Sequence, residues 1–101
     1  MEKRSSTFLM ANLGSEVTRL LLAREEKKEE LIRGAYERSL RILDELESLE
    51  DMATRLDELK ILRKVIDNLL TEDPEIKVSP TNLKEYFMPF ALRALSEDKI
   101  I

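Results

Sequence analysis

The chain lacks four residue types on which much protein chemistry depends. Its 101 residues include no Cys, His, Trp or Gln. Without Cys there is neither a disulfide nor a thiol nucleophile, and without His the commonest general base and transition-metal ligand is missing. Most structural zinc sites are excluded for the same reason. A nucleophilic triad would need an unusual Ser–Lys or Thr arrangement, and no supporting motif is present.

Glycine and proline are also scarce, with two and three residues respectively. Gly14 and Gly34 are isolated, so there is neither a phosphate-binding loop nor a dinucleotide fingerprint. No run of roughly 20 apolar residues could cross a bilayer. The apolar stretch at residues 8–11 is too short for a signal peptide. We therefore expect a cytoplasmic protein that binds no membrane, no cofactor and no metal.

Charged residues make up 38% of the chain, against about 25% in typical domains. The 43% of hydrophobic residues suffices for a core and argues against disorder. Abundant Glu, Lys and Arg without Cys or Gln resembles the composition of thermophilic proteins, so we expect a thermophilic source. The net charge of −4 disfavours nonspecific binding to nucleic acid or to acidic membranes.

Apolar residues recur at spacings of three and four, which indicates helices rather than strands. The sequence predicts helices over about 6–23, 26–47, 50–71 and 80–96. Ser79 and Pro80 are a good start for the last helix, and Pro89 must kink or split it. The expected fold is all-α: a single-domain antiparallel bundle of three to four helices. We expect a long central hairpin around residues 26–71, with the Pro-kinked C-terminal helix across it.

The connections leave alternatives open. Seven consecutive charges, residues 24–30, form either an exposed helical bridge or a turn, and their helix-forming types favour the bridge. Gly14 could break the first helix early. Ser48 and Asp51 resemble a capping box, so we expect a hairpin turn near residues 47–50. A continuous helix with a skip is the alternative.

The third stretch has more apolar surface than one seam uses. Arg63 holds the only polar position of a heptad-like seam formed by Leu49, Met52, Leu56, Leu59, Ile66 and Leu70. A second stripe consists of Ile61, Leu62, Val65 and Leu69, and further surplus apolar residues are Leu22, Leu31 and Ile42. An uncovered stripe usually marks an interface.

Three of the five aromatic residues, Tyr86, Phe87 and Phe90, lie within five positions. Such a cluster either closes the core or docks on a partner. We predict the second stripe and this cluster as the partner-binding residues.

Basic residues suggest a second kind of site. Arg24, Lys27, Lys28, Arg38 and Arg41 would share a narrow arc if one helix ran through them. Such an arc could follow a phosphate backbone. Interspersed acidic residues favour ordinary surface ion pairs instead.

Carboxylates at helical spacing suggest a third kind of site. Glu26 and Glu29 form one pair, and Asp44, Glu47 and Asp51 repeat the spacing. Such pairs resemble the magnesium site of all-helical nucleotide pyrophosphohydrolases of the MazG type. That family's pattern is Glu-x-x-Glu, a spacer and Glu-x-x-Asp, whereas the second half here is Glu-x-x-Glu or Asp-x-x-Glu. The resemblance implies a divergent magnesium-dependent enzyme, and a solvated acidic face is the simpler interpretation.

Together these features favour a non-enzymatic helical protein–protein interaction module. It would act as a small homo-oligomer, such as a homodimer, or as an accessory subunit of a larger complex. One alternative is an accessory subunit of a DNA- or RNA-processing machine, touching nucleic acid through residues 24–41 only as part of that complex. The other alternative is the pyrophosphohydrolase.

Overall fold

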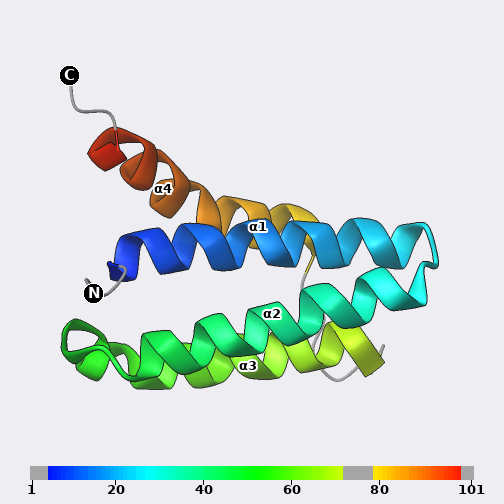
Figure 1. Ribbon diagram of the computed structural model, residues 1–101, viewed down its shortest axis with the longest axis horizontal. Coiled ribbons are helices and arrows are strands. Elements are labelled where there is room, and N and C mark those ends of the chain that lie inside the picture. Colours follow the sequence, from blue (N-terminus) through cyan, green and yellow to red (C-terminus); the bar gives the residue numbers. More distant parts are fainter. Residues whose placement is uncertain (1–4, 72–78, 99–101) are drawn as a thin grey trace.

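The computed structural model describes residues 5–71 and 79–98. These residues form four α-helices and one 3-10 helix: α1 (Ser6–Glu25), α2 (Glu29–Glu47), η1 (Glu50–Arg55), α3 (Leu56–Thr71) and α4 (Pro80–Asp98). Successive helices run antiparallel, as Figure 1 shows. The predicted all-α antiparallel bundle is therefore confirmed.

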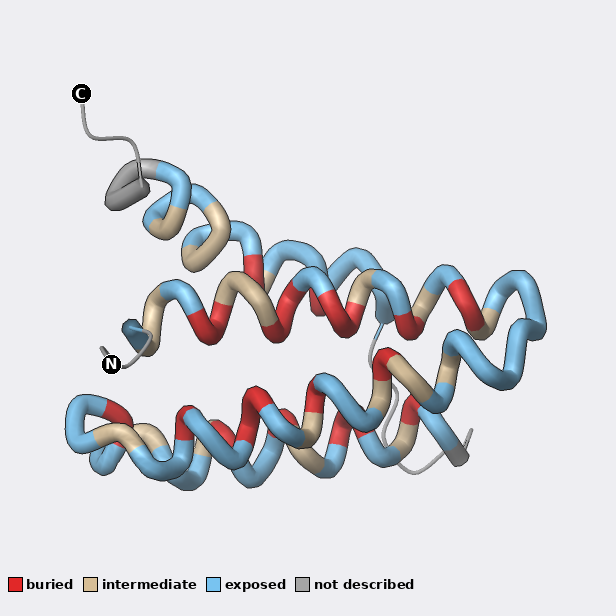
Figure 2. The backbone as a smooth tube through the Cα atoms, viewed as in Figure 1, coloured by how far each residue is buried: buried red, intermediate tan, exposed pale blue. Residues whose placement is uncertain are grey.

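Helix α1 is the centre of the bundle. Its apolar stripe is almost completely inaccessible to solvent and consists of Leu9, Met10, Leu13, Val17 and Leu20. α1 contacts α2 on one side and α4 on another, while α3 packs mainly on α2. Figure 2 shows the buried positions along the facing sides of these helices. The prediction that the hairpin of residues 26–71 forms the core, with the last helix across it, is thus corrected: α4 packs on α1.

A close approach at Gly14 explains why α4 packs there. α1 does not break at this residue but continues to Glu25. A Cβ atom placed on Gly14 would lie 2.8 Å from the Cβ atom of Phe87 and 2.9 Å from its Cγ atom. Only glycine leaves room for this contact, through which Phe87 becomes buried in the core.

The charged run turns rather than bridging two helices. The Lys27 N–H donates to the Arg24 carbonyl (3.1 Å), and the Lys28 N–H donates to the Ala23 carbonyl (3.0 Å). Lys27 has a φ of 56°, so these bonds form a Schellman motif with lysine in the left-handed position that glycine usually takes. Residues 6–47 are therefore two helices, and the helical bridge is the wrong interpretation. Consecutive charges have no apolar side to bury, so the chain can leave the bundle surface here.

The α2–α3 connection confirms the expected hairpin turn but not the capping box. The Ser48 hydroxyl donates to the Glu45 carbonyl (2.6 Å), so Ser48 closes α2 instead of starting the next helix. The following residues form η1, and α3 begins at Leu56 rather than near residue 50. The Ser6 hydroxyl donates to the Asp51 carboxylate (2.6 Å), which ties the start of α1 to η1.

The start of α4 was predicted correctly. The Ser79 hydroxyl accepts a hydrogen bond from the Asn82 N–H (3.0 Å), and Pro80 is the first helical residue. Pro89 lies inside a continuous helix and has no N–H to donate to the preceding turn. α4 bends near its middle, and its second half diverges from α1 (Figure 1).

The two glycines give a matched stability test. Alanine favours helix over glycine by about 1 kcal/mol, yet Gly14→Ala should destabilise the fold by about 1–3 kcal/mol because its methyl group overlaps Phe87. Gly34→Ala is the control. A Cβ atom there would lie 3.1 Å from Nη1 of Arg38, at the far end of a long side chain that can shift by a few tenths of an ångström while its Nε–H still bonds Glu16, so we expect stabilisation of about 0.5–1 kcal/mol. Urea unfolding of both variants measures the difference. Stabilisation by both substitutions would disprove the close contact.

Candidate partner-binding surface

Most of the predicted α3 stripe lies in the core. Leu62, Val65 and Leu69 are buried, whereas Ile61 is 63% exposed. The first three residues cannot form a docking surface on the folded chain, and the prediction is corrected for them. The actual seam of α3 runs through Leu59, Leu62, Ile66 and Leu69, with Val65 beside it. The two stripes expected from the sequence are thus one seam in a shifted phase, which leaves Leu56 and Leu70 exposed.

Arg63 lies at the edge of this seam, where it joins α3 to α2. Its Nη2 atom donates to both Asp44 and Glu47 at 2.9 Å. The hydrogen bond with Glu47 contributes most to raising the pKa of Arg63. Further along the same helices, the Tyr36 hydroxyl donates to Asp67 (2.6 Å), and this bond raises the pKa of Tyr36.

The carboxylates of the pyrophosphohydrolase resemblance are not brought together. Asp44 and Glu47 bind Arg63, and Asp51 accepts from Ser6. Glu26 lies in the α1–α2 turn, where it pairs with Lys28 at 3.3 Å, so it does not share a helix with Glu29. Among residues 5–71 and 79–98, no three Asp, Glu, His or Cys side chains form a group that could hold a metal ion.

The aromatic cluster attaches α4 to the rest of the bundle. Phe87 is part of the core, and Tyr86 and Phe90 pack against it. The rings of Tyr86 and Phe87 meet edge to face, with centroids 5.0 Å apart. The Arg55 guanidinium lies 5.4 Å from the centroid of Phe90, and the Tyr86 hydroxyl donates to Glu58. Of the two interpretations, the structure supports closure of the core, so these residues are not a free docking patch.

This attachment shifts the pKa values of Glu58 and Tyr86, among others. The hydrogen bond from Arg55, whose Nε atom lies 3.3 Å from Oε1 of Glu58, lowers the pKa of Glu58. Burial is the main cause that raises the pKa of Tyr86, and its bond to Glu58 adds to it.

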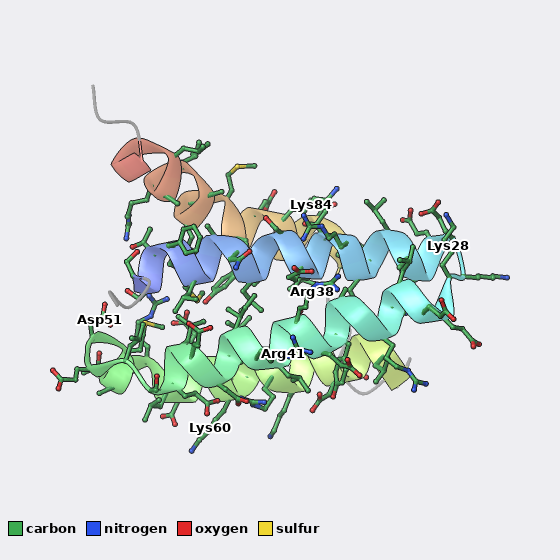
Figure 3. The ribbon with its side chains drawn as sticks, viewed as in Figure 1. Lys28, Arg38, Arg41, Asp51, Lys60 and Lys84 are labelled. Atoms are coloured by element: carbon green, nitrogen blue, oxygen red, sulfur yellow. The ribbon has the colours of Figure 1, made fainter. Side chains whose placement is uncertain are left out.

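The predicted basic arc is divided by the α1–α2 turn. Figure 3 shows Lys28 at the tip of that turn, Arg38 between α1 and α2, and Arg41 farther along α2. Arg24 is partly buried near the end of α1, and Lys27 is exposed in the turn. The single helix that would align these five residues does not exist.

Arg38 has a structural partner. Its Nε atom donates to Oε1 of Glu16, and Nη1 of Arg19 donates to Oε2 of the same carboxylate, both at 3.0 Å. Glu16 is only 5% exposed, so these two guanidinium groups neutralise a buried charge between α1 and α2.

The structure shows a further exposed apolar surface, on α4. Met88, Leu92 and Leu95 are spaced four and three residues apart along α4 and are 54–61% exposed. Beside them, two adjoining hollows of about 290 and 350 Å³ lie between α1 and α4, and both are lined by Ala11, Ser15 and Ala91. Phe8, Asn12, Ala94 and Leu95 complete one hollow, and Gly14, Thr18, Lys84, Phe87 and Met88 complete the other. We call the three exposed residues and these hollows the α4 surface. The spacing of residues 88, 92 and 95 was a signal for it in the sequence.

Comparisons with known proteins find one informative similarity. The DNA mismatch repair protein MutS of Thermus aquaticus is 36% identical over 100 residues. The match covers 96% of this chain but 12% of the length of that protein, so it concerns one segment of a much larger molecule. No family model and no solved structure matches the chain. Over the part of the chain that the structure describes, none of the helices has the length and apolarity needed to cross a membrane.

The attachment of α4 predicts a pH dependence. Because folding lowers the pKa of Glu58, its contribution to stability is present above the unfolded value, about 4.3, and is lost as the pH falls through the folded value. The side chain is more than one-third exposed, so the contribution should be at most about 1 kcal/mol. The difference in unfolding free energy between the wild type and Glu58→Gln should shrink between about pH 5 and pH 3. Urea unfolding at each pH measures it, with exposed Glu37→Gln as the control. If the difference in unfolding free energy for Glu58→Gln does not change with pH, the lowered pKa of Glu58 is contradicted.

Proposed function

We propose that this chain is a non-enzymatic helical interaction module that binds a protein partner through the α4 surface. The observation that carries the proposal is the exposure of Met88, Leu92 and Leu95 on one face of α4. Single exposed leucines are common on soluble proteins, whereas a row of large apolar residues beside an apolar groove is typical of an interface. Fully burying such a side chain contributes about 1.5–3 kcal/mol, and roughly half of that remains to be gained at each of these partly exposed residues, so three anchors can offset part of the cost of association.

The shape of the α4 surface supports a helical partner. Large side chains on α4 stand next to hollows lined by small residues, including Ala11, Ser15 and Ala91. Ridges of one helix pack into the grooves of another in this way. A second copy of the chain has both parts of such an interface and could form a two-fold dimer.

The similarity to a DNA mismatch repair protein supports placing the module in a DNA-processing assembly, as an accessory subunit or helical segment. The relative comes from Thermus aquaticus, which also supports the thermophilic source expected from composition. The proposed DNA-processing assembly and the support for a thermophilic source depend on this similarity. The proposed binding surface depends instead on the geometry of α4.

Self-association tests the α4 surface. We expect the wild type to be a dimer by light scattering behind size exclusion, over a hundredfold range of concentration. Met88→Glu combined with Leu95→Glu should give a monomer with unchanged helical circular dichroism, because both side chains already contact solvent. Ile61→Glu, at an equally exposed apolar site on α3, is the matched control and should remain a dimer. A monomeric wild type would refute the homodimer, and dissociation by Ile61→Glu alone would refute the choice of surface.

A second candidate function is direct contact with nucleic acid through residues 24–41. The observation that favours it is the same similarity to a DNA mismatch repair protein. Of the five predicted cations, Lys27 and Arg41 are exposed and lie outside the Glu16 and Glu26 ion pairs. They belong to different elements, so the contact would use the surface around the α1–α2 turn and α2.

A gel shift at about 50 mM salt tests this candidate, because low salt strengthens phosphate contacts. Lys27→Ala with Arg41→Ala should abolish the shift of a DNA duplex. Lys60→Ala with Lys64→Ala removes the same charge from α3 and should leave the shift in place. If the wild type gives no shift at this salt concentration, direct contact is refuted.

A further inference from the structure

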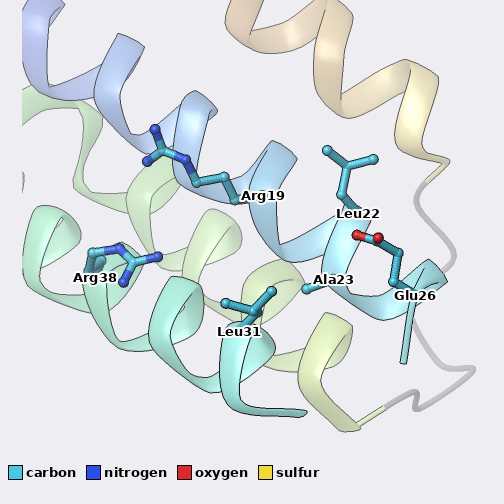
Figure 4. A pocket seen from close by; sticks show the side chains of 6 residues that line it. All are labelled: Arg19, Leu22, Ala23, Glu26, Leu31 and Arg38. Atoms are coloured by element: carbon cyan, nitrogen blue, oxygen red, sulfur yellow. The ribbon is translucent and has the colours of Figure 1, made fainter. Parts of the chain in front are cut away.

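A hollow on the opposite half of α1 has the composition of a small binding site. It lies between α1 and the first half of α2, has a volume of about 220 Å³, and is lined by Arg19, Leu22, Ala23, Glu26, Leu31 and Arg38 (Figure 4). Leu22 and Leu31, both surplus apolar residues in the sequence, are 53% and 54% exposed. The hollow shares no residue with the α4 surface, so it is independent of the proposed function.

Two guanidinium groups are held in place beside these leucines. Arg19 and Arg38 each donate one hydrogen bond to buried Glu16, at 3.0 Å. One carboxylate against two guanidinium groups leaves a surplus positive charge. Each guanidinium has five N–H donors, so most donors remain for another acceptor. The side chains are 62% and 47% exposed, so a ligand can reach those donors. Because Glu16 already fixes the groups, binding an anion requires little further ordering of them.

The size and polarity of the hollow limit its ligand. Sites for whole small molecules occupy about 300–1,000 Å³, so about 220 Å³ suits a side chain rather than a cofactor. In Figure 4, Glu26 lies at the end near the α1–α2 turn, and Arg38 lies at the other end. The ligand should therefore place its negative group toward the guanidinium end, with an apolar group between the two leucines.

We propose that this hollow binds an acidic segment of a partner protein. One aliphatic side chain lies between Leu22 and Leu31, and a neighbouring carboxylate accepts hydrogen bonds from Arg19 and Arg38. A nucleic acid fits less well because it offers no aliphatic side chain to lie between the two leucines. The hollow is complementary in charge and polarity to a carboxylate next to a leucine-like residue. This combination is found in acidic amphipathic peptides.

An NMR titration of the full ¹⁵N-labelled chain tests the proposal. The probe is the acetylated peptide Glu-Asp-Leu-Leu-Asp-Glu. We expect chemical-shift changes centred on the amides of Leu22 and Leu31 and on the Arg38 side-chain N–H. A peptide with lysine at the four acidic positions should bind at least about tenfold more weakly, a difference of about 1.4 kcal/mol.

Variants separate the two parts of the site. Leu22→Ala with Leu31→Ala should weaken binding about tenfold. Arg19→Gln should weaken it severalfold while Arg38 continues to pair with Glu16, so this variant keeps the fold. Ile61→Ala, on α3, is the matched control and should bind as the wild type does.

The outcomes that overturn the proposal are distinct. They are absence of peptide binding to the wild type, unchanged binding by the Leu22/Leu31 variant, and shift changes centred on Met88 and Leu95. Tighter binding of a single-stranded DNA oligonucleotide at the hollow would assign it to nucleic acid instead. None of these results depends on the light-scattering outcome, so failure here and failure of the proposed α4 interface are distinguishable.

Discussion

The contact between Phe87 and the backbone of α1 at Gly14 determines how this bundle closes. α1 must cover α2 on one side and receive α4 on another, and a side chain at residue 14 would hold α4 away. With glycine there, Phe87 enters the core and the first half of α4 lies along α1. Pro89 then bends the helix, and the second half diverges. The same contact therefore closes the core and, among the described residues, leaves Met88, Leu92 and Leu95 of α4 exposed.

Polar contacts at the edges of the core fix how the helices align. Arg63 joins α3 to two carboxylates of α2, and Tyr36 binds Asp67 between the same helices. These groups are substantially exposed, so each contributes little free energy. Glu16 differs because its charge is buried and its partner Arg38 reaches it from the neighbouring helix α2. We therefore regard the outer pairs as determinants of register and the Glu16 group as a requirement for packing α1 on α2.

The sequence predicted the helices better than the turns between them and the faces on which they pack. Apolar spacing located all four helices, and Ser79 with Pro80 marked the start of α4. The α1–α2 turn was the less favoured of two alternatives because lysine, not glycine, takes the left-handed position, and lysine is also a good helix former. The phase of α3 was missed because the heptad pattern was extended back through η1, which is not α-helical. Once α3 begins at Leu56, one seam accounts for all its buried residues.

The candidate sites show the same limit. Burial could not be assigned to Leu62, Val65 and Leu69 without the phase of α3, so the interface was placed on core residues. The surplus of apolar side chains at Leu22 and Leu31 was visible in the sequence. The position of the guanidinium groups beside them was not, because it depends on pairing with Glu16 across two helices. The α4 surface and the hollow occupy opposite halves of α1 and share no residue. On the two proposals, α1 would hold a second copy of the chain at one half and an acidic partner segment at the other. The dimer would then present two hollows to one partner, and binding of the first acidic segment would raise the effective concentration of a second, so two weak contacts would give a stable assembly.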